Sequence, residues 1–99
     1  MHSYRFEAEL WEYSAGQSAW VFVSVPADDS ERIRELPRPP KPGFGSVRVS
    51  VTIGSSTWKT SIFPDSKSGT YFLPVKKAIR LAEDIDVGGM CRVELEVLE

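Results

Sequence analysis

The sequence holds few residues that could assemble an acid–base catalytic site. The one histidine, His2, adjoins the initiator methionine, and a frayed terminus cannot hold a base within about 3.2 Å of a nucleophile. Carboxylate pairs could replace it, at Asp28 with Asp29 and at Asp84 with Asp86. Both pairs stand beside expected turns or helix ends, where acidic residues usually cap and solvate. We therefore expect neither the histidine nor these carboxylates to be catalytic.

A serine and a lysine could form a nucleophilic dyad. Lys59 and Ser61 are two positions apart in an expected strand, which places both on one face. Such a dyad needs a desolvated amine with a lowered pKa, and we expect Lys59 to project to solvent instead. The single cysteine, Cys91, has no disulfide partner and should begin a strand as a small buried side chain. The sequence thus predicts no catalytic residue, no cofactor and no metal site, and it leaves enzyme activity open.

Basic residues supply a candidate anion surface. Lys76, Lys77 and Arg80 are the most concentrated basic group, and the i, i+4 spacing puts Lys76 and Arg80 on one helix face. That face could meet an anion or a phosphate backbone. The favoured interpretation is a solvated helix face balanced by Glu83, Asp84 and Asp86. The net charge of −2 argues against nucleic-acid binding over a large face but permits a local basic patch.

Aromatic residues supply the other part of a candidate surface. We expect Trp20 and Trp58 to be core residues because each lies in a strongly apolar strand, and Trp11 and Tyr13 to be more exposed. The candidate ligand or anion surface comprises Trp58, Lys59, Ser61, Tyr71, Lys76, Lys77 and Arg80.

Alternation of apolar and polar residues predicts about six strands. The clearest covers residues 47–53, where Val47, Val49, Val51 and Ile53 alternate with polar side chains. A turn at Gly54 to Ser56 should join it to the next strand in a hairpin. Residues 20–25 are apolar on both faces apart from Ser24, so they should form an interior strand covered on two sides. The expected strands are residues 4–10, 20–25, 47–53, 57–63, 70–73 and a last strand that turns Val93, Leu95 and Val97 inward.

Two short helices are expected between the strands. Asp28 and Glu31 have the spacing of a capping box, which predicts a helix of about two turns before the prolines that begin at Pro37. Pro74 stands where proline opens a helix, followed by Val75, Ala78, Ile79 and Ala82 at helical spacing. Residues 37–45 should form a stiff, extended connector, and whether it covers a pocket is open.

Length and composition fit a single soluble domain over residues 1–99. Ninety-nine residues with 41% hydrophobic side chains can bury one core. No apolar run approaches the length of about 18 residues that spans a bilayer, and the first ten residues alternate instead of forming a signal-peptide core. We expect a cytoplasmic protein with no membrane partner. Without repeated strand–helix–strand units, a mostly β barrel capped by two short helices is favoured.

Four ordered motifs carry a family resemblance over nearly the whole chain. They are Trp20-Val-Phe-Val-Ser-Val-Pro26, Gly45-Ser-Val-Arg-Val-Ser-Val-Thr-Ile-Gly54, Trp58-Lys-Thr-Ser-Ile-Phe-Pro64 and Tyr71-Phe-Leu-Pro-Val-Lys-Lys-Ala-Ile-Arg80. The chain resembles the domain-of-unknown-function family numbered 1905. The resemblance implies a bacterial double-split β-barrel capped by helices, distantly similar in fold to AbrB-type and MazE-type regulators.

The second half of the chain is similar to the proline–helix–glycine–strand unit of those regulators. Leu73 and Pro74 precede the helix with Arg80, and Gly88 and Gly89 precede an alternating strand. The regulators carry Gly-Asp where this chain has Gly88-Gly89, which weakens the transfer of their function but not of their fold. The resemblance implies no established activity. Some members carry a bacteriocin-protection domain after this one; since the sequence ends at Glu99, we expect the domain to act alone or with a separate partner.

Three hypotheses about function follow. The leading one is a non-catalytic binding or accessory domain that recognises a protein or a small ligand. The alternative is a dimeric DNA-binding regulator of the swapped-hairpin kind, which would use Lys76, Lys77 and Arg80. A small enzyme of unknown reaction is the second alternative, and the oligomeric state is open.

Overall fold

The computed structural model describes residues 2–37 and 45–98. In chain order, these residues form β1 (His2–Glu9), β2 (Trp11–Ala15), β3 (Ser18–Ser24), α1 (Ala27–Arg34), β4 (Val47–Ile53), β5 (Ser56–Pro64), β6 (Tyr71–Pro74), α2 (Lys77–Glu83) and β7 (Met90–Val97).

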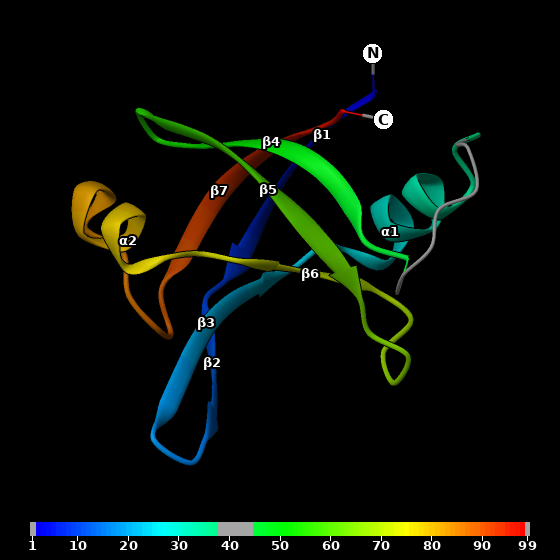
Figure 1. Ribbon diagram of the computed structural model, residues 1–99. Coiled ribbons are helices and arrows are strands. Elements are labelled where there is room, and N and C mark those ends of the chain that lie inside the picture. Colours follow the sequence, from blue (N-terminus) through cyan, green and yellow to red (C-terminus); the bar gives the residue numbers. More distant parts are fainter. Residues whose placement is uncertain (1, 38–44, 99) are drawn as a thin grey trace.

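All strand pairs are antiparallel, and the sheet curls into a half-barrel (Figure 1). The strand order is β1-β7-β4-β5-β6-β3-β2. β1 and β2 stand at opposite ends of this order, although only Leu10 separates them in the chain, so the sheet must curl to bring its two ends together. The Leu10 backbone marks this junction: its N–H donates to the Gly89 carbonyl at 2.9 Å, and its carbonyl accepts from Gly88 N–H at 2.8 Å.

The core lies inside the curl and follows from period-two alternation. In β4 every second residue faces inward and is at most 3% exposed, while Arg48 points outward. β7 repeats the pattern with Val93, Leu95 and Val97 inward, as the sequence predicts. The inner faces of β3, β5 and β6 add Val21, Val23, Ile62, Tyr71 and Leu73 to the core, and α1 and α2 add Ile33 and Ile79.

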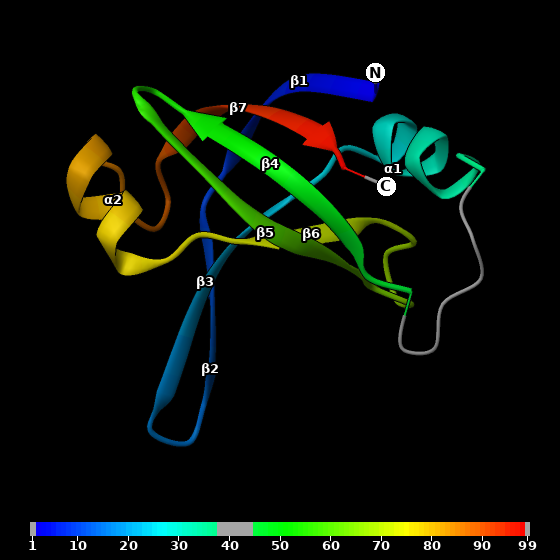
Figure 2. The ribbon, with the colours of Figure 1, turned by 45° about the horizontal axis from the view of Figure 1, so that its top comes forward.

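The described residues form a sheet of seven strands, so the expectation of about six is wrong. The additional strand is β2, which pairs with β3 in a hairpin that projects from the body (Figure 2). Every residue from 12 to 20 is exposed. Trp11, Tyr13 and Ala15 do alternate with Glu12 and Ser14, but none of these side chains is buried, so the alternation marks no core-facing side. It is also out of phase with the alternation from Tyr4 to Leu10, and no separate strand was predicted here from the sequence.

The prediction that residues 20–25 are covered on both faces is also wrong. Val21, Val23 and Val25 are buried on the inner face, but Trp20 is 57% exposed on the outer one. Phe22 is half-buried because aromatic neighbours surround it: its ring lies 4.9 Å from those of Trp11 and Phe72. Trp11, expected to be exposed, is therefore only half-exposed.

The first helix does not begin with the predicted capping box. α1 starts at Ala27 after Pro26, which has no side chain able to cap, and Asp28 lies within the first turn. Buried Ser30 ties the helix to the sheet: its hydroxyl donates to the Val25 carbonyl at 3.1 Å and accepts from Tyr71 N–H at 3.0 Å.

The second helix begins later than predicted. Pro74 ends β6 and pairs with Phe22, and α2 starts only at Lys77, after Lys76 in an extended conformation. Val75 and Ile79 are buried as expected, whereas Ala78 and Ala82 are exposed because the short helix covers the half-barrel with one narrow face. Figure 1 places α2 near the β4–β5 turn and α1 on the opposite side of the half-barrel.

Most of the predicted connector, residues 38–44, lies outside the described residues. Among the helices that are described, none has the length and apolar character needed to span a bilayer.

Candidate functional site

A cleft of about 460 Å³ opens between the first half of β3, the middle of β5 and the start of α2. We call it the tryptophan–lysine cleft because two tryptophans and three lysines line it. The lining residues are Ala19, Trp20, Val21, Trp58, Lys59, Thr60, Pro74, Val75, Lys76, Lys77 and Arg80.

Three chain segments meet at this cleft, and backbone bonds hold them together. β3 contributes Trp20, and β5 contributes Trp58 and Lys59. The β6–α2 junction is fixed to β3 because Val75 N–H donates to the Val21 carbonyl at 2.9 Å. This bond places the cations of residues 76–80 opposite the tryptophans of the sheet.

The side chain of Arg80 is held in place by a backbone carbonyl five residues earlier in the chain. Its Nε–H donates to the Val75 carbonyl at 3.2 Å, and the side chain is half-buried. The bond uses only one of the several N–H donors of the guanidinium. Arg80 therefore lies preorganised in the cleft with donors left for an anion.

The cleft is cationic. Lys59, Lys76, Lys77 and Arg80 line it together with no carboxylate. Within residues 2–37 and 45–98, none of these four forms an ion pair. Negative charge is found in an adjoining depression of about 300 Å³, which Asp84 and Asp86 line together with Lys77 and Arg80.

Glu83, the third expected counter-charge, serves another purpose. Its carboxylate accepts hydrogen bonds from the hydroxyl of Ser56 and from the N–H and hydroxyl of Ser55, at the β4–β5 turn. These bonds favour the charged form, the Ser56 hydroxyl most, and lower the pKa of Glu83. The side chain thus anchors α2 to the turn and does not neutralise the cleft.

The two tryptophans of the cleft differ in exposure. Trp58 lies opposite Val51 in the β4–β5 pair and is half-buried against the core, in keeping with its expected core position. Trp20 was expected in the core but is 57% exposed, paired with Tyr13 across the projecting hairpin. Its indole is available to a ligand.

Five of the seven residues in the predicted surface line the cleft, and two do not. Tyr71 is 3% exposed because it lies on the inner face of β6, beneath α1. Ser61 is half-buried further along β5 and contributes nothing to the cleft lining. Trp20 was missed, although its alternation with Val21, Val23 and Val25 places it on the opposite face of the strand and could have signalled exposure.

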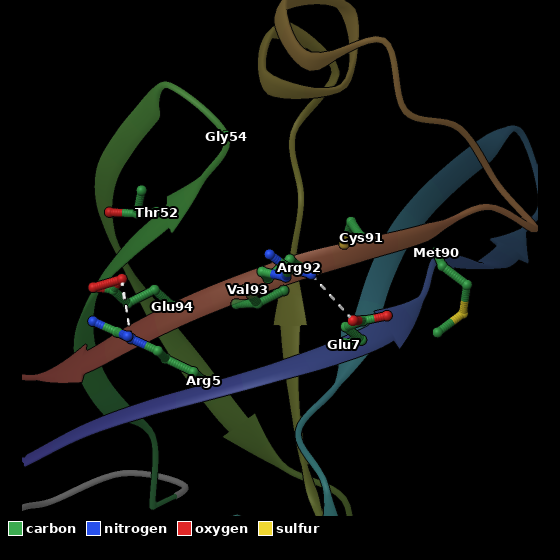
Figure 3. A pocket seen from close by; sticks show the side chains of 9 residues that line it. All are labelled: Arg5, Glu7, Thr52, Gly54, Met90, Cys91, Arg92, Val93 and Glu94. Atoms are coloured by element: carbon green, nitrogen blue, oxygen red, sulfur yellow. Dashed lines mark ion pairs between the residues drawn. The ribbon is translucent and has the colours of Figure 1, made fainter.

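A second, larger depression of about 640 Å³ lies over β1 and β7 (Figure 3). The charged side chains that line it form two ion pairs between directly opposite residues of β1 and β7. Arg5 contacts Glu94 at 3.4 Å, and Arg92 contacts Glu7 at 3.5 Å. The pairing leaves no net charge for a ligand, so this depression is the weaker candidate.

Neither His2 nor Cys91 lines the tryptophan–lysine cleft. His2 is exposed in β1, and Lys59 is exposed as expected. Cys91 is buried near the start of β7, as predicted, and burial raises the pKa of its thiol. In the part of the chain that the structure describes, no three His, Cys, Asp or Glu side chains are grouped to hold a metal.

In residues 2–37 and 45–98, fold and cleft together define a small, β-rich domain with two helices and a cationic aromatic cleft. The family described as Domain of unknown function (DUF1905) matches residues 6–95, nearly the whole chain, and the protein belongs to that family. The resemblance drawn from the four motifs is thereby confirmed. No curated protein matches the chain.

Proposed function

We propose that this protein is a non-catalytic binding domain that holds a small anionic ligand in the tryptophan–lysine cleft. The proposal rests on one observation: four cations and two tryptophans from three separate segments converge on a cavity whose lining contains no carboxylate. A cleft lined by one sign of charge concentrates ligands of the opposite charge.

The cleft also has the dimensions and chemistry of a ligand site. Its volume of about 460 Å³ lies in the range of small-molecule pockets. Apolar walls from Val21, Pro74 and Val75 accompany the polar groups, a combination typical of such sites. A preorganised arginine binds an oxyanion with little loss of side-chain entropy.

Calorimetric titration with pyrophosphate and citrate tests the proposal. We expect one of these anions to bind the wild type, more weakly as salt rises. Lys76→Ala should weaken binding at least about tenfold, because a hydrogen bond to a charged group contributes about 1.5–3 kcal/mol. Lys67→Ala is the matched control, since it removes one exposed cation from the β5–β6 loop, outside the cleft. Absence of binding, or equal affinity of the two variants, contradicts the proposal.

A dimeric DNA-binding regulator of the swapped-hairpin kind is the second candidate. It is favoured by the projecting β2–β3 hairpin, with exposed Tyr13 and Trp20, and by the gathering of Lys76, Lys77 and Arg80. The net charge of −2 limits such binding to a local patch. A mobility shift at low salt that weakens steeply with added salt, together with a dimer in sedimentation, would support it. No shift at low salt, or a monomer, would exclude it.

We also infer that the half-barrel belongs to the double-split β-barrel class, closed where β1 passes into β2. The backbone bonds of Leu10 to Gly88 and Gly89 support closure at this point. A bacterial, cytoplasmic protein stays the expectation from the sequence.

A further inference from the structure

We propose that the ligand of the tryptophan–lysine cleft is a nucleotide, that is, an aromatic base joined to phosphate, either free or within a single strand of nucleic acid. This inference rests on the proposed function and adds the class of ligand. It follows from how the cations and the rings are distributed between the segments that form the cleft.

The phosphate would lie against the β6–α2 junction. Lys76, Lys77 and Arg80 all come from this one short segment, and the Val75 carbonyl holds the Arg80 side chain by its Nε–H. Arginine and lysine donors gathered in this way suit the oxygens of a phosphate group. Asp84 and Asp86 face the adjoining depression and do not line the cleft.

The base would lie against the sheet side. Trp20 offers an indole that is 57% exposed, and half-buried Trp58 lines the same cavity from β5. A nucleic-acid base stacked on an aromatic side chain gains about 1–3 kcal/mol. An inorganic anion would use only the cations, and a neutral aromatic compound only the rings. A nucleotide satisfies both.

Hydrogen bonds that attach α2 to the sheet support a preformed nucleotide site. Glu83 bonds to Ser55 and Ser56 and so holds the helix beside β5, which carries Trp58 and Lys59. The separation between the cationic segment and the rings is therefore set by the fold, independently of any ligand.

The test compares four probes by calorimetric titration: adenosine 5′-monophosphate, adenosine, inorganic phosphate and a single-stranded oligodeoxyadenylate. We expect adenosine 5′-monophosphate to bind at least about tenfold more tightly than either adenosine or phosphate, since it alone makes both sets of contacts. An oligonucleotide that binds at least tenfold more tightly than the mononucleotide identifies a strand as the source. Equal or weaker binding identifies a free nucleotide.

Three variants separate the contribution of the base to affinity from that of the phosphate. Trp20→Ala should lower affinity for adenosine 5′-monophosphate about tenfold and leave phosphate binding unchanged. Trp20→Phe should restore most of the loss, because it keeps an aromatic ring. Tyr13→Ala is the matched control: Tyr13 is also 57% exposed and pairs with Trp20, but it does not line the cleft.

The outcomes distinguish the two proposals. If inorganic phosphate binds as tightly as adenosine 5′-monophosphate, or if Trp20→Ala has no effect, the nucleotide inference is wrong and the anion-binding proposal stands. If pyrophosphate, citrate, phosphate and the nucleotide all fail to bind, the proposed function itself is wrong.

Discussion

The Ser56 hydroxyl donates a hydrogen bond of 2.5 Å to the Glu83 carboxylate, across a sequence separation of 27 residues. Ser56 opens β5 and Glu83 ends α2, so this contact joins the hairpin of the sheet to the helix that carries Lys77 and Arg80. The geometry of the cleft depends on a residue that is not part of its lining.

The Glu83 anchor predicts a pH-dependent stability. Hydrogen bonds lower the pKa of Glu83 in the folded state below its ordinary value of 4.5. Its stabilising contribution is therefore complete above the unfolded-state pKa and is lost as pH falls through the folded-state pKa. We expect Glu83→Gln to lower the midpoint of thermal unfolding at pH 7, and the difference from wild type to shrink below about pH 4.5. A difference that stays constant from pH 7 to pH 3 would contradict this role.

Gly54 tests the same anchor by steric means. A Cβ at this position would lie 1.9 Å from Glu83 Oε1, and the backbone φ of +60° disfavours other residues. Gly54→Ala should lose roughly 1–2 kcal/mol through backbone strain, and further stability as Glu83 is displaced. In urea unfolding, the loss in the Gly54→Ala/Glu83→Gln double variant should be smaller than the sum of the single losses. Additive losses would show that the two sites are independent.

Ser30 is expected to contribute strongly to stability. Its buried hydroxyl bonds both the Val25 carbonyl and Tyr71 N–H, so Ser30→Ala leaves two buried backbone groups without a partner. The free energy of unfolding should fall by about 1–3 kcal/mol. Ser14→Ala, at an exposed position of β2, is the control and should change stability little. Equal effects of the two substitutions in urea unfolding would rule out this role.

Cys91 should be unreactive in the folded protein. Its side chain is 7% exposed, and burial raises the pKa of the thiol, so the reactive thiolate is scarce at neutral pH. At pH 7.5 we expect a disulfide reagent such as Ellman's reagent to label the native protein slowly and the urea-unfolded protein rapidly. Rapid stoichiometric labelling of the native protein would contradict the burial of Cys91.

Strands with one buried and one solvated face were predictable from sequence. β4 and β7 alternate strictly, so Val49 and Leu95 could be assigned to the core from their spacing alone. β2 also alternates, at Trp11, Tyr13 and Ala15, but its residues beyond Trp11 are exposed on both faces, so the pattern there marks no core and the strand was missed. Pro74 satisfies the local preference for a helix start, but pairing of β6 with β3 extends the strand through it.

The cleft was predictable only in part. The clustering of Lys76, Lys77 and Arg80 is local and visible in the sequence. The approach of Trp20 to these cations is not, because it depends on the β3–β6 pairing and on the Val21–Val75 backbone bond. Tyr71 was included in the predicted surface as an aromatic residue, yet the pleat of β6 turns it into the core.

The most direct test uses the indole N–H resonances of the three tryptophans in a ¹⁵N-labelled sample titrated with adenosine 5′-monophosphate and, separately, with pyrophosphate. Trp20 and Trp58 line the cleft, whereas the Trp11 indole N–H donates to Ser24 Oγ at 3.0 Å outside it and serves as an internal reference. Binding in the cleft predicts that at least one probe shifts the Trp20 and Trp58 resonances in a saturable manner while Trp11 stays fixed. If neither probe moves those two resonances, or if all three move alike, the tryptophan–lysine cleft is not the binding site.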